Sequence, residues 1–243
     1  MIGINHLSHS QVTTFLMCPR RWWYDKQAQA PKERTAAALV FGSAVHDAIA
    51  GIHEASLMGL PCDRTSLFTS CWKQQVQATA ETPICYGKDD ASDLHAKGQQ
   101  LIATYQPPPG ICGVEQPFEI ELSEDLPPIV GRIDLIRADQ QGQLVLADVK
   151  TCSSRMLSET ASVEAQLGLY DQAYPAVAHE VIVLGKQKAP TITIQPVTPW
   201  PVTRLRQHYQ EVCQAMQAGI RYANPGWQCE TCPFYNRCQA DGR

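Results

Sequence analysis

The sequence predicts an α/β fold in a single domain that spans residues 1–243. In residues 1–110, apolar side chains recur mostly every three or four positions, as they do on helices. In residues 111–200, apolar and polar residues alternate in short runs, which is typical of β-strands. Residues 201–243 begin with a long helical pattern and end in a cysteine-rich stretch without periodicity. Because a helical pattern also falls between the strands, we expect a mixed sheet of about five strands flanked by helices.

Helices are predicted where this spacing occurs, and a capping residue precedes some of them. Asp63 is such an N-cap, and the Pro-Pro-Pro-Gly run at 107–110 ends the last helix of the first part. The predicted helices are residues 11–17, 20–24, 40–57, 64–81, 93–105, 162–173 and 203–222, and the predicted strands are residues 115–122, 129–137, 144–150, 179–184 and 191–197.

The charge and the apolar pattern limit the class of protein. A net charge of −4 argues against coating DNA by bulk charge but allows a local basic groove. No apolar run reaches the roughly 18 residues that span a bilayer, and the first residues do not form a secretory signal, so we expect a cytoplasmic protein. The groove candidates, some of which are expected to be ordinary surface charges, are Arg20, Arg21, Arg132, Lys150, Arg155, Lys186 and Lys188.

Two carboxylates and a lysine are predicted at one edge of the sheet. Asp134 and Asp148 lie on neighbouring strands, near their ends, and Lys150 is two positions beyond Asp148 and therefore on the same face. Carboxylates bind a divalent metal, which lowers the pKa of water, and a lysine can orient the hydroxide or neutralise a phosphate. The pattern therefore predicts phosphodiester hydrolysis.

Neighbouring motifs strengthen this interpretation. His46, on the predicted helix 40–57, can add a nitrogen ligand, which suits manganese better than magnesium. Gln166 and Tyr170 are four residues apart and share one face of a helix. The alternative is that the first carboxylate caps a turn and that the D-V-K sequence at 148–150 forms an exposed ion pair.

The order of these motifs resembles that of the PD-(D/E)XK nucleases, in the branch of RecB-type exonucleases. The motifs are the helix histidine, G-R-I-D at 131–134, D-V-K at 148–150 and Q-L-G-L-Y at 166–170. The resemblance implies a restriction-endonuclease-like core in residues 111–200 and a bound Mg²⁺ or Mn²⁺. It implies that the metal ligands are His46, Asp134, Asp148 and the carbonyl of Val149, that Lys150 is catalytic, and that Gln166 and Tyr170 are accessory. Glu115 matches an acid often present on the first strand, although a strand glutamate ordinarily faces solvent.

Ten cysteines are many for a chain expected in the cytoplasm, where disulfides are rare. Cys229, Cys232 and Cys238 form a C-x₂-C-x₅-C motif, and Cys18 is the candidate for a fourth ligand. Spacing alone leaves zinc and an iron–sulfur cluster open. The other six are expected to behave as small hydrophobic residues, namely Cys62, Cys71, Cys85, Cys112, Cys152 and Cys213.

The cysteine pattern is similar to the iron–sulfur subset of the same superfamily, which includes the AddB subunit of recombination exonucleases and the CRISPR-adaptation nucleases. The resemblance implies a [4Fe–4S] cluster in a lobe that joins both termini, with zinc as the alternative. It implies a metal-dependent deoxyribonuclease, an exonuclease on single strands or frayed ends, in DNA processing, recombination or the antiviral defence of CRISPR adaptation. The expected partners are DNA, contacted by Arg20, Arg21 and Arg132, and an adaptation integrase or a recombination helicase, with no membrane. The alternatives are a flap endonuclease and a non-catalytic iron–sulfur module that binds DNA ends.

Overall fold

The computed structural model of the chain describes residues 2–87, 89–152, 160–187 and 189–242. Its centre is a five-stranded sheet with the order β3-β4-β5-β6-β7. Strands β5 and β6 are parallel and the other neighbours are antiparallel, so the predicted mixed sheet and α/β class are confirmed. The strands are β3 (Ile111–Ile120), β4 (Ile129–Ala138), β5 (Leu144–Cys152), β6 (Ala178–Gly185) and β7 (Thr191–Pro196).

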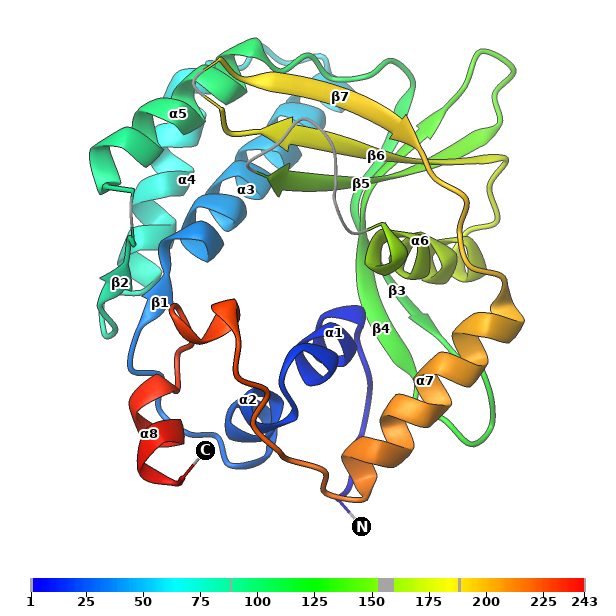
Figure 1. The fold of residues 1–243 in the computed structure, drawn as a ribbon. Helices are drawn as coiled ribbons and strands as arrows, with labels where there is room; N and C mark the ends of the chain where they lie inside the picture. The colour runs from blue at the N-terminus through cyan, green and yellow to red at the C-terminus, as the bar shows by residue number, and fades with distance from the viewer. Residues whose placement is uncertain (1, 88, 153–159, 188, 243) are drawn as a thin grey trace.

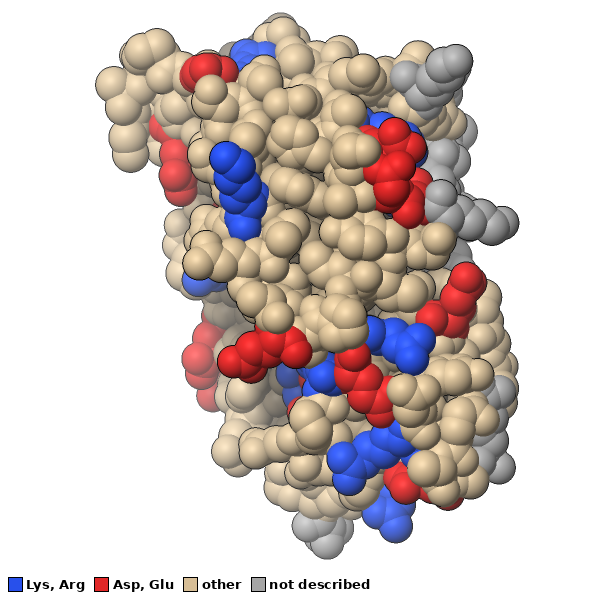
Figure 2. All heavy atoms as spheres, turned by 90° about the vertical axis from the view of Figure 1, so that its left-hand side faces the viewer, with Lys and Arg blue, Asp and Glu red and all other residues tan. Residues whose placement is uncertain are grey.

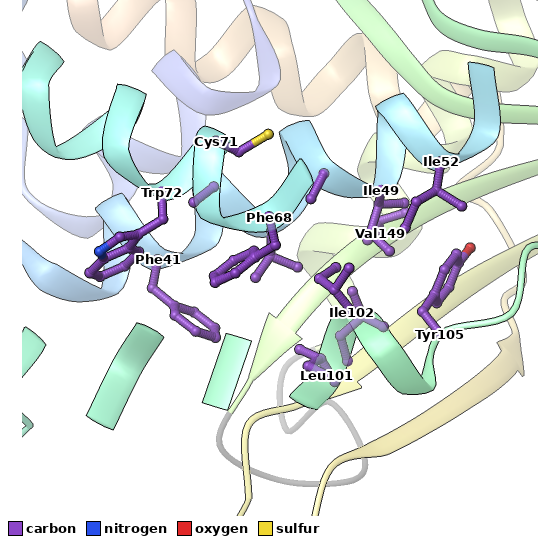
Figure 3. Close-up of a cluster of buried hydrophobic side chains, with 14 of the residues drawn as sticks. Phe41, Ile49, Ile52, Phe68, Cys71, Trp72, Leu101, Ile102, Tyr105 and Val149 are labelled. Atoms are coloured by element: carbon purple, nitrogen blue, oxygen red, sulfur yellow. The ribbon is translucent and has the colours of Figure 1, made fainter. Parts of the chain in front are cut away.

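Three helices form a core against one face of the sheet (Figures 1 and 3). The ring of Phe68 is fully buried, and α5 crosses it so closely that a Cβ at Gly98 would lie 2.0 Å from the ring. Truncating such a ring to alanine costs about 3–5 kcal/mol, so this contact fixes the helical layer. The helices are α3 (Ala37–Met58), α4 (Arg64–Ala78) and α5 (Ala91–Thr104).

The opposite face of the sheet packs on α6 (Ala161–Ala173), which is held in turn by α7 (Val202–Gln217) and α1 (His9–Met17). Side chains alternate along β5. Ala147 and Val149 belong to the core beneath α3, whereas Leu146 belongs to the core beneath α6. The side chains of Asp148 and Lys150 follow Leu146 in steps of two, so they also face α6.

The two ends of the chain meet in a terminal lobe, which is drawn in blue and red in Figure 1. Tyr24 donates a hydrogen bond of 2.6 Å to Asp241, and the Glu33 carboxylate accepts 2.9 Å bonds from two backbone N–H groups of the C-terminal helix. These bonds tie the N-terminal segment to the C-terminal helix. The lobe contains α2 (Pro19–Trp22), a π-helical turn η1 (Trp23–Gln27), η2 (Trp227–Cys229) and α8 (Tyr235–Ala240).

A few elements differ from the prediction. The segments 27–37 and 82–90, for which no helix or strand was predicted, each contain a short strand, β1 (Thr35–Ala36) and β2 (Ile84–Cys85), which pair in parallel. Helix α7 ends earlier than predicted, because Gly219 adopts a left-handed φ of 73° that stops the helix. None of the helices in the described ranges is long and apolar enough to cross a membrane.

Candidate functional site

Three acidic residues form a row across β3, β4 and β5. The register of β3 against β4 sets Glu115 opposite Asp134. One step beyond the pair Leu135–Ala147, the register of β4 against β5 sets Asp134 opposite Asp148. The sheet therefore places the three acids side by side, although a hairpin connection separates each one from the next in the sequence.

The backbone at Glu115 departs from a regular strand. Its φ of 47° is left-handed, a conformation that costs a residue with a Cβ about 1–2 kcal/mol. Two flanking pairs on either side of it keep the ladder register, so the departure is local. Strained positions of this kind concentrate at functional sites, and this one carries a carboxylate beside His46.

The side chains of His46, Glu115 and Asp134 converge. Each offers one ligand atom, and these atoms all lie within 4.8 Å of one another. Nδ1 of His46 lies 3.7 Å from Oδ2 of Asp134. Within the described part of the chain, no other group of three such residues is this close. One imidazole nitrogen and two carboxylate oxygens are a donor set that fits a divalent cation such as Mn²⁺.

The ionisation of these groups suits cation binding. Burial, followed by the charge of Lys150, lowers the pKa of His46, so its ring is neutral near neutral pH, the form that binds metals. Burial and then the neighbouring Asp148 raise the pKa of Asp134 well above its ordinary value. Burial also raises the pKa of Glu115. A cation supplies the positive charge that this acidic row needs, and its binding would release protons.

A second cluster surrounds Lys150. Its ammonium lies 3.0 and 2.8 Å from the two carboxylate oxygens of Asp148 and donates a 2.9 Å bond to Gln166. The Gln166 amide donates a 2.8 Å bond to the Tyr170 hydroxyl, which lies 3.4 Å from Asp148. The structure therefore joins the strand motif D-V-K to the helix motif Q-L-G-L-Y.

Lys150 is a cation in this environment. Burial alone would lower the pKa of the ammonium, but the charges of Asp148 and Asp134 outweigh it and raise that pKa. The side chain still exposes 32% of its surface. It can therefore present a positive charge and hydrogen-bond donors to an anion, and it does not act as a base near neutral pH.

Asp148 and Val149 lie between the group of candidate metal ligands and the cluster around Lys150. Asp148 is fully buried and faces Lys150 and Tyr170, outside the group of three ligands within 4.8 Å. The Val149 N–H donates a 2.8 Å bond to Oδ2 of Asp134, and the Val149 backbone also interacts with the His46 ring. Direct metal ligation by Asp148 and by the Val149 carbonyl stays a prediction.

Two hollows border these clusters, and Arg132 lines both. The first hollow, with the three candidate ligands, also contains Leu39. The second contains Lys150 and extends to the first turn of α1 and of α6. Sequence reasoning missed His9 in this second hollow, because one histidine at a helix start has no spacing signal. The residues that line the second hollow and carry polar groups are Ser8, His9, Ser10, Thr13, Arg132, Lys150, Ser162, Gln166 and Tyr170.

The predicted basic groove is only partly assembled. Arg132 is exposed between the hollows, but Arg20 donates to the backbone carbonyls of Arg221 and Gly242, at 3.3 and 2.7 Å, within the terminal lobe. Lys186 lies over the Phe41 ring. On the side that carries α5 and α8, basic residues are interspersed with acidic ones (Figure 2). Arg155 and Lys188 lie outside the described residues.

The four candidate cluster cysteines, Cys18, Cys229, Cys232 and Cys238, line one pocket in the terminal lobe. A [4Fe–4S] cluster and a tetrahedral zinc ion each bind four thiolates. Which of the two this pocket binds stays a prediction.

A solved structure shares this architecture. The crystal structure of a "putative exonuclease" from Eubacterium rectale is similar, with a TM-score of 0.62 and 13% identity over 96% of this chain and 88% of that one. The crystal structure of SSO0001 aligns with a TM-score of 0.49 and 14% identity, over 99% of this chain and 88% of that one. No curated protein sequence matches significantly. The sequence profile of the PD-(D/E)XK nuclease superfamily matches residues 6–239, and the chain, with its acidic row beside a lysine on adjacent strands, therefore belongs to that superfamily.

Proposed function

We propose that this nuclease is a divalent-metal-dependent DNA exonuclease that acts on single strands or frayed ends. The observation that carries the proposal is the Lys150 ammonium, which is held between Asp148 and Gln166 beside the row of acids. A phosphodiester bears one negative charge, and its hydrolysis adds more at the phosphate oxygens, so a fixed cation beside a metal site stabilises the transition state.

Each residue has a distinct part in this mechanism. His46, Glu115 and Asp134, with Asp148 and the Val149 carbonyl, would hold Mg²⁺ or Mn²⁺, which polarises the phosphate and acidifies water when bound. Lys150 stays protonated and neutralises the phosphate. Gln166 and Tyr170 fix the direction of the ammonium and of Asp148 through their hydrogen bonds.

The surroundings of the site favour a single strand that enters by its end. The hollow of the candidate ligands shares Leu39 with a third hollow, which reaches the terminal lobe through Arg21 and Phe234, and shares Arg132 with the hollow of Lys150. Each hollow thus shares a lining residue with the next, from the hollow of Lys150 to the terminal lobe. A continuous duplex is wide and stiff, whereas a single strand can follow such a path, with Arg21 and Arg132 as phosphate contacts and Arg20 nearby.

The terminal lobe is proposed to bind a [4Fe–4S] cluster through Cys18, Cys229, Cys232 and Cys238, with zinc as the alternative. Such a cluster would join segments more than two hundred residues apart, which restricts the unfolded chain strongly. The cysteine pattern also supports a role in recombination or CRISPR adaptation, with a helicase or an adaptation integrase as the partner protein.

Digestion of labelled oligonucleotides tests the proposal. Linear single strands, blunt duplexes, flaps and covalently closed single-stranded circles would be incubated with Mn²⁺ and wild-type protein or Lys150→Ala. We expect linear single strands to be shortened from an end and circles to survive. Cleavage of circles or of flap junctions would establish an endonuclease instead. Intact substrates throughout, with DNA ends still bound, would establish the non-catalytic module.

A further inference from the structure

We propose that His9 is a positioning residue of the nuclease site, which holds Ser162 and thereby sets where α6 presents Gln166 to Lys150. The inference rests on the proposed function for its kinetic consequence, but its structural content does not. His9 belongs neither to the candidate ligands nor to the D-V-K and Q-L-G-L-Y motifs.

The His9 ring joins three helices. It is the first residue of α1, where Ser8 caps the helix by accepting a 3.2 Å bond from the Gln11 N–H. Its Nδ1 lies 2.9 Å from the Tyr209 hydroxyl on α7, and its Nε2 lies 2.9 Å from the Ser162 hydroxyl on α6. Both ring nitrogens are therefore engaged, and the ring has one fixed orientation.

Ser162 is in the right place to transmit this constraint. Ser162, Gln166 and Tyr170 follow one another in steps of four, so they share one face of α6, and all three line the hollow of Lys150. Thr160, the N-cap of α6, makes no capping hydrogen bond through its side chain. The contact from His9 therefore anchors the first turn of the helix through the Ser162 side chain, and the side chain of the N-cap adds no such bond.

The electrostatics agree with a positioning role. Burial, followed by the charge of Lys150 and then that of His208, lowers the pKa of His9 to about 4. The ring is neutral near neutral pH, so it orders the hollow without repelling the lysine. Reactions lose rate steeply when a contact shifts, since a misplacement of about 1 Å can cost about 100-fold.

Asparagine or glutamine at position 9 would each keep one of the two hydrogen bonds of the His9 ring. The Asn amide overlays Nδ1, and the Gln amide overlays Nε2. We expect His9→Asn, which keeps the Tyr209 bond, to lower kcat about 10–100-fold with an oligonucleotide Kd within about twofold of wild type. His9→Gln, which keeps the Ser162 bond, and Tyr209→Phe should stay within about threefold of wild-type kcat. The double variant His9→Asn with Ser162→Ala should be no slower than the slower single variant, because both changes break the same link.

A second readout does not need activity. Amide hydrogen exchange in the first turn of α6 should quicken in His9→Asn and in Ser162→Ala but not in His9→Gln, with α3 unchanged as the internal control. Equal exchange in all variants, or additive losses of kcat in the double variant, would overturn the positioning role. If wild-type protein cuts no nucleic acid yet the exchange pattern appears, the proposed function fails and the positioning role stands.

Discussion

The ammonium of Lys150 donates a 2.9 Å hydrogen bond to the side-chain oxygen of Gln166, on a helix that begins after the strand motif has ended. The direction of the cation is thus set by α6 as well as by its own strand. This relationship explains why the lysine, the buried Asp148 and the Q-L-G-L-Y motif occur together, and it motivates the first prediction.

Replacing the lysine should remove chemistry and spare the fold. We expect Lys150→Ala to lower kcat at least about 10³-fold, because it removes a preorganised charge at the reacting phosphate, while the oligonucleotide Kd changes by less than about tenfold. Lys97→Ala, which removes a surface lysine paired with Asp89, is the matched control. Single-turnover cleavage with Mn²⁺ measures both, and wild-type rates in the lysine variant would refute its role.

Asp134 should make the metal-free protein less stable as pH rises. Its pKa is raised in the folded state by burial and by Asp148, so its contribution is complete below the ordinary carboxyl pKa near 4 and is lost as pH climbs through the raised value. Asp134→Asn should therefore be more stable than wild type at pH 8 in chelator, and the gap should close toward pH 4. Urea unfolding at several pH values measures this, with Asp93→Asn on α5 as the control. A gap that is constant with pH would contradict the assignment.

At position 115, glycine should stabilise the fold more than alanine, which is the reverse of the usual order in a strand. At a φ of 47°, glycine avoids the cost of a Cβ, so Glu115→Gly should be more stable than Glu115→Ala by about 1 kcal/mol. Both variants should bind Mn²⁺ more weakly than wild type, as titration calorimetry would show. At Glu119, in the same strand with ordinary φ, alanine should be the more stable. If alanine is the more stable replacement at both positions, the backbone at Glu115 is not strained.

Loss of one of the four pocket cysteines should prevent binding of the cluster. Cys232→Ser should lose the brown absorbance and the iron of anaerobically purified protein, because a cluster needs all four thiolates. Cys112→Ser, at an exposed cysteine on β3, should keep both. A full iron content in the Cys232 variant would refute the assignment of the four cysteines as cluster ligands. Stoichiometric zinc in wild-type protein would identify the alternative metal.

Replacing each of the two adjacent arginines should have a different effect. Arg21→Ala should lower the salt slope of single-strand binding by about one and weaken all sequences alike, as loss of one phosphate contact does. Arg20→Ala should mainly lower thermal stability, because it breaks two bonds that tie α2 to the C-terminal segment. Anisotropy titrations over a salt series, together with thermal unfolding, distinguish them. Equal salt slopes for Arg21→Ala and wild type would remove Arg21 from the DNA path.

Local pattern was enough to predict most elements, since apolar spacing and caps act within a few residues. Asp63 caps α4 as expected, by accepting from the Ser66 N–H at 3.2 Å. The pair β1 and β2 escaped prediction because two residues hold no periodicity, and their pairing comes from chain segments that only the folded core brings together.

For the site, the sequence by itself determined which chemical groups are present: carboxylates and a lysine in short motifs on adjacent strands, a histidine on a helix and four spaced cysteines. Only the tertiary structure decided which of them converge, because that depends on strand register, on the left-handed turn at Glu115 and on helices packed across the sheet. It drew Glu115 into the group with His46 and Asp134, turned Asp148 toward Lys150, tied Arg20 to the backbone and added His9. Contacts between residues far apart in the chain leave no mark in local spacing, and packing alone creates them.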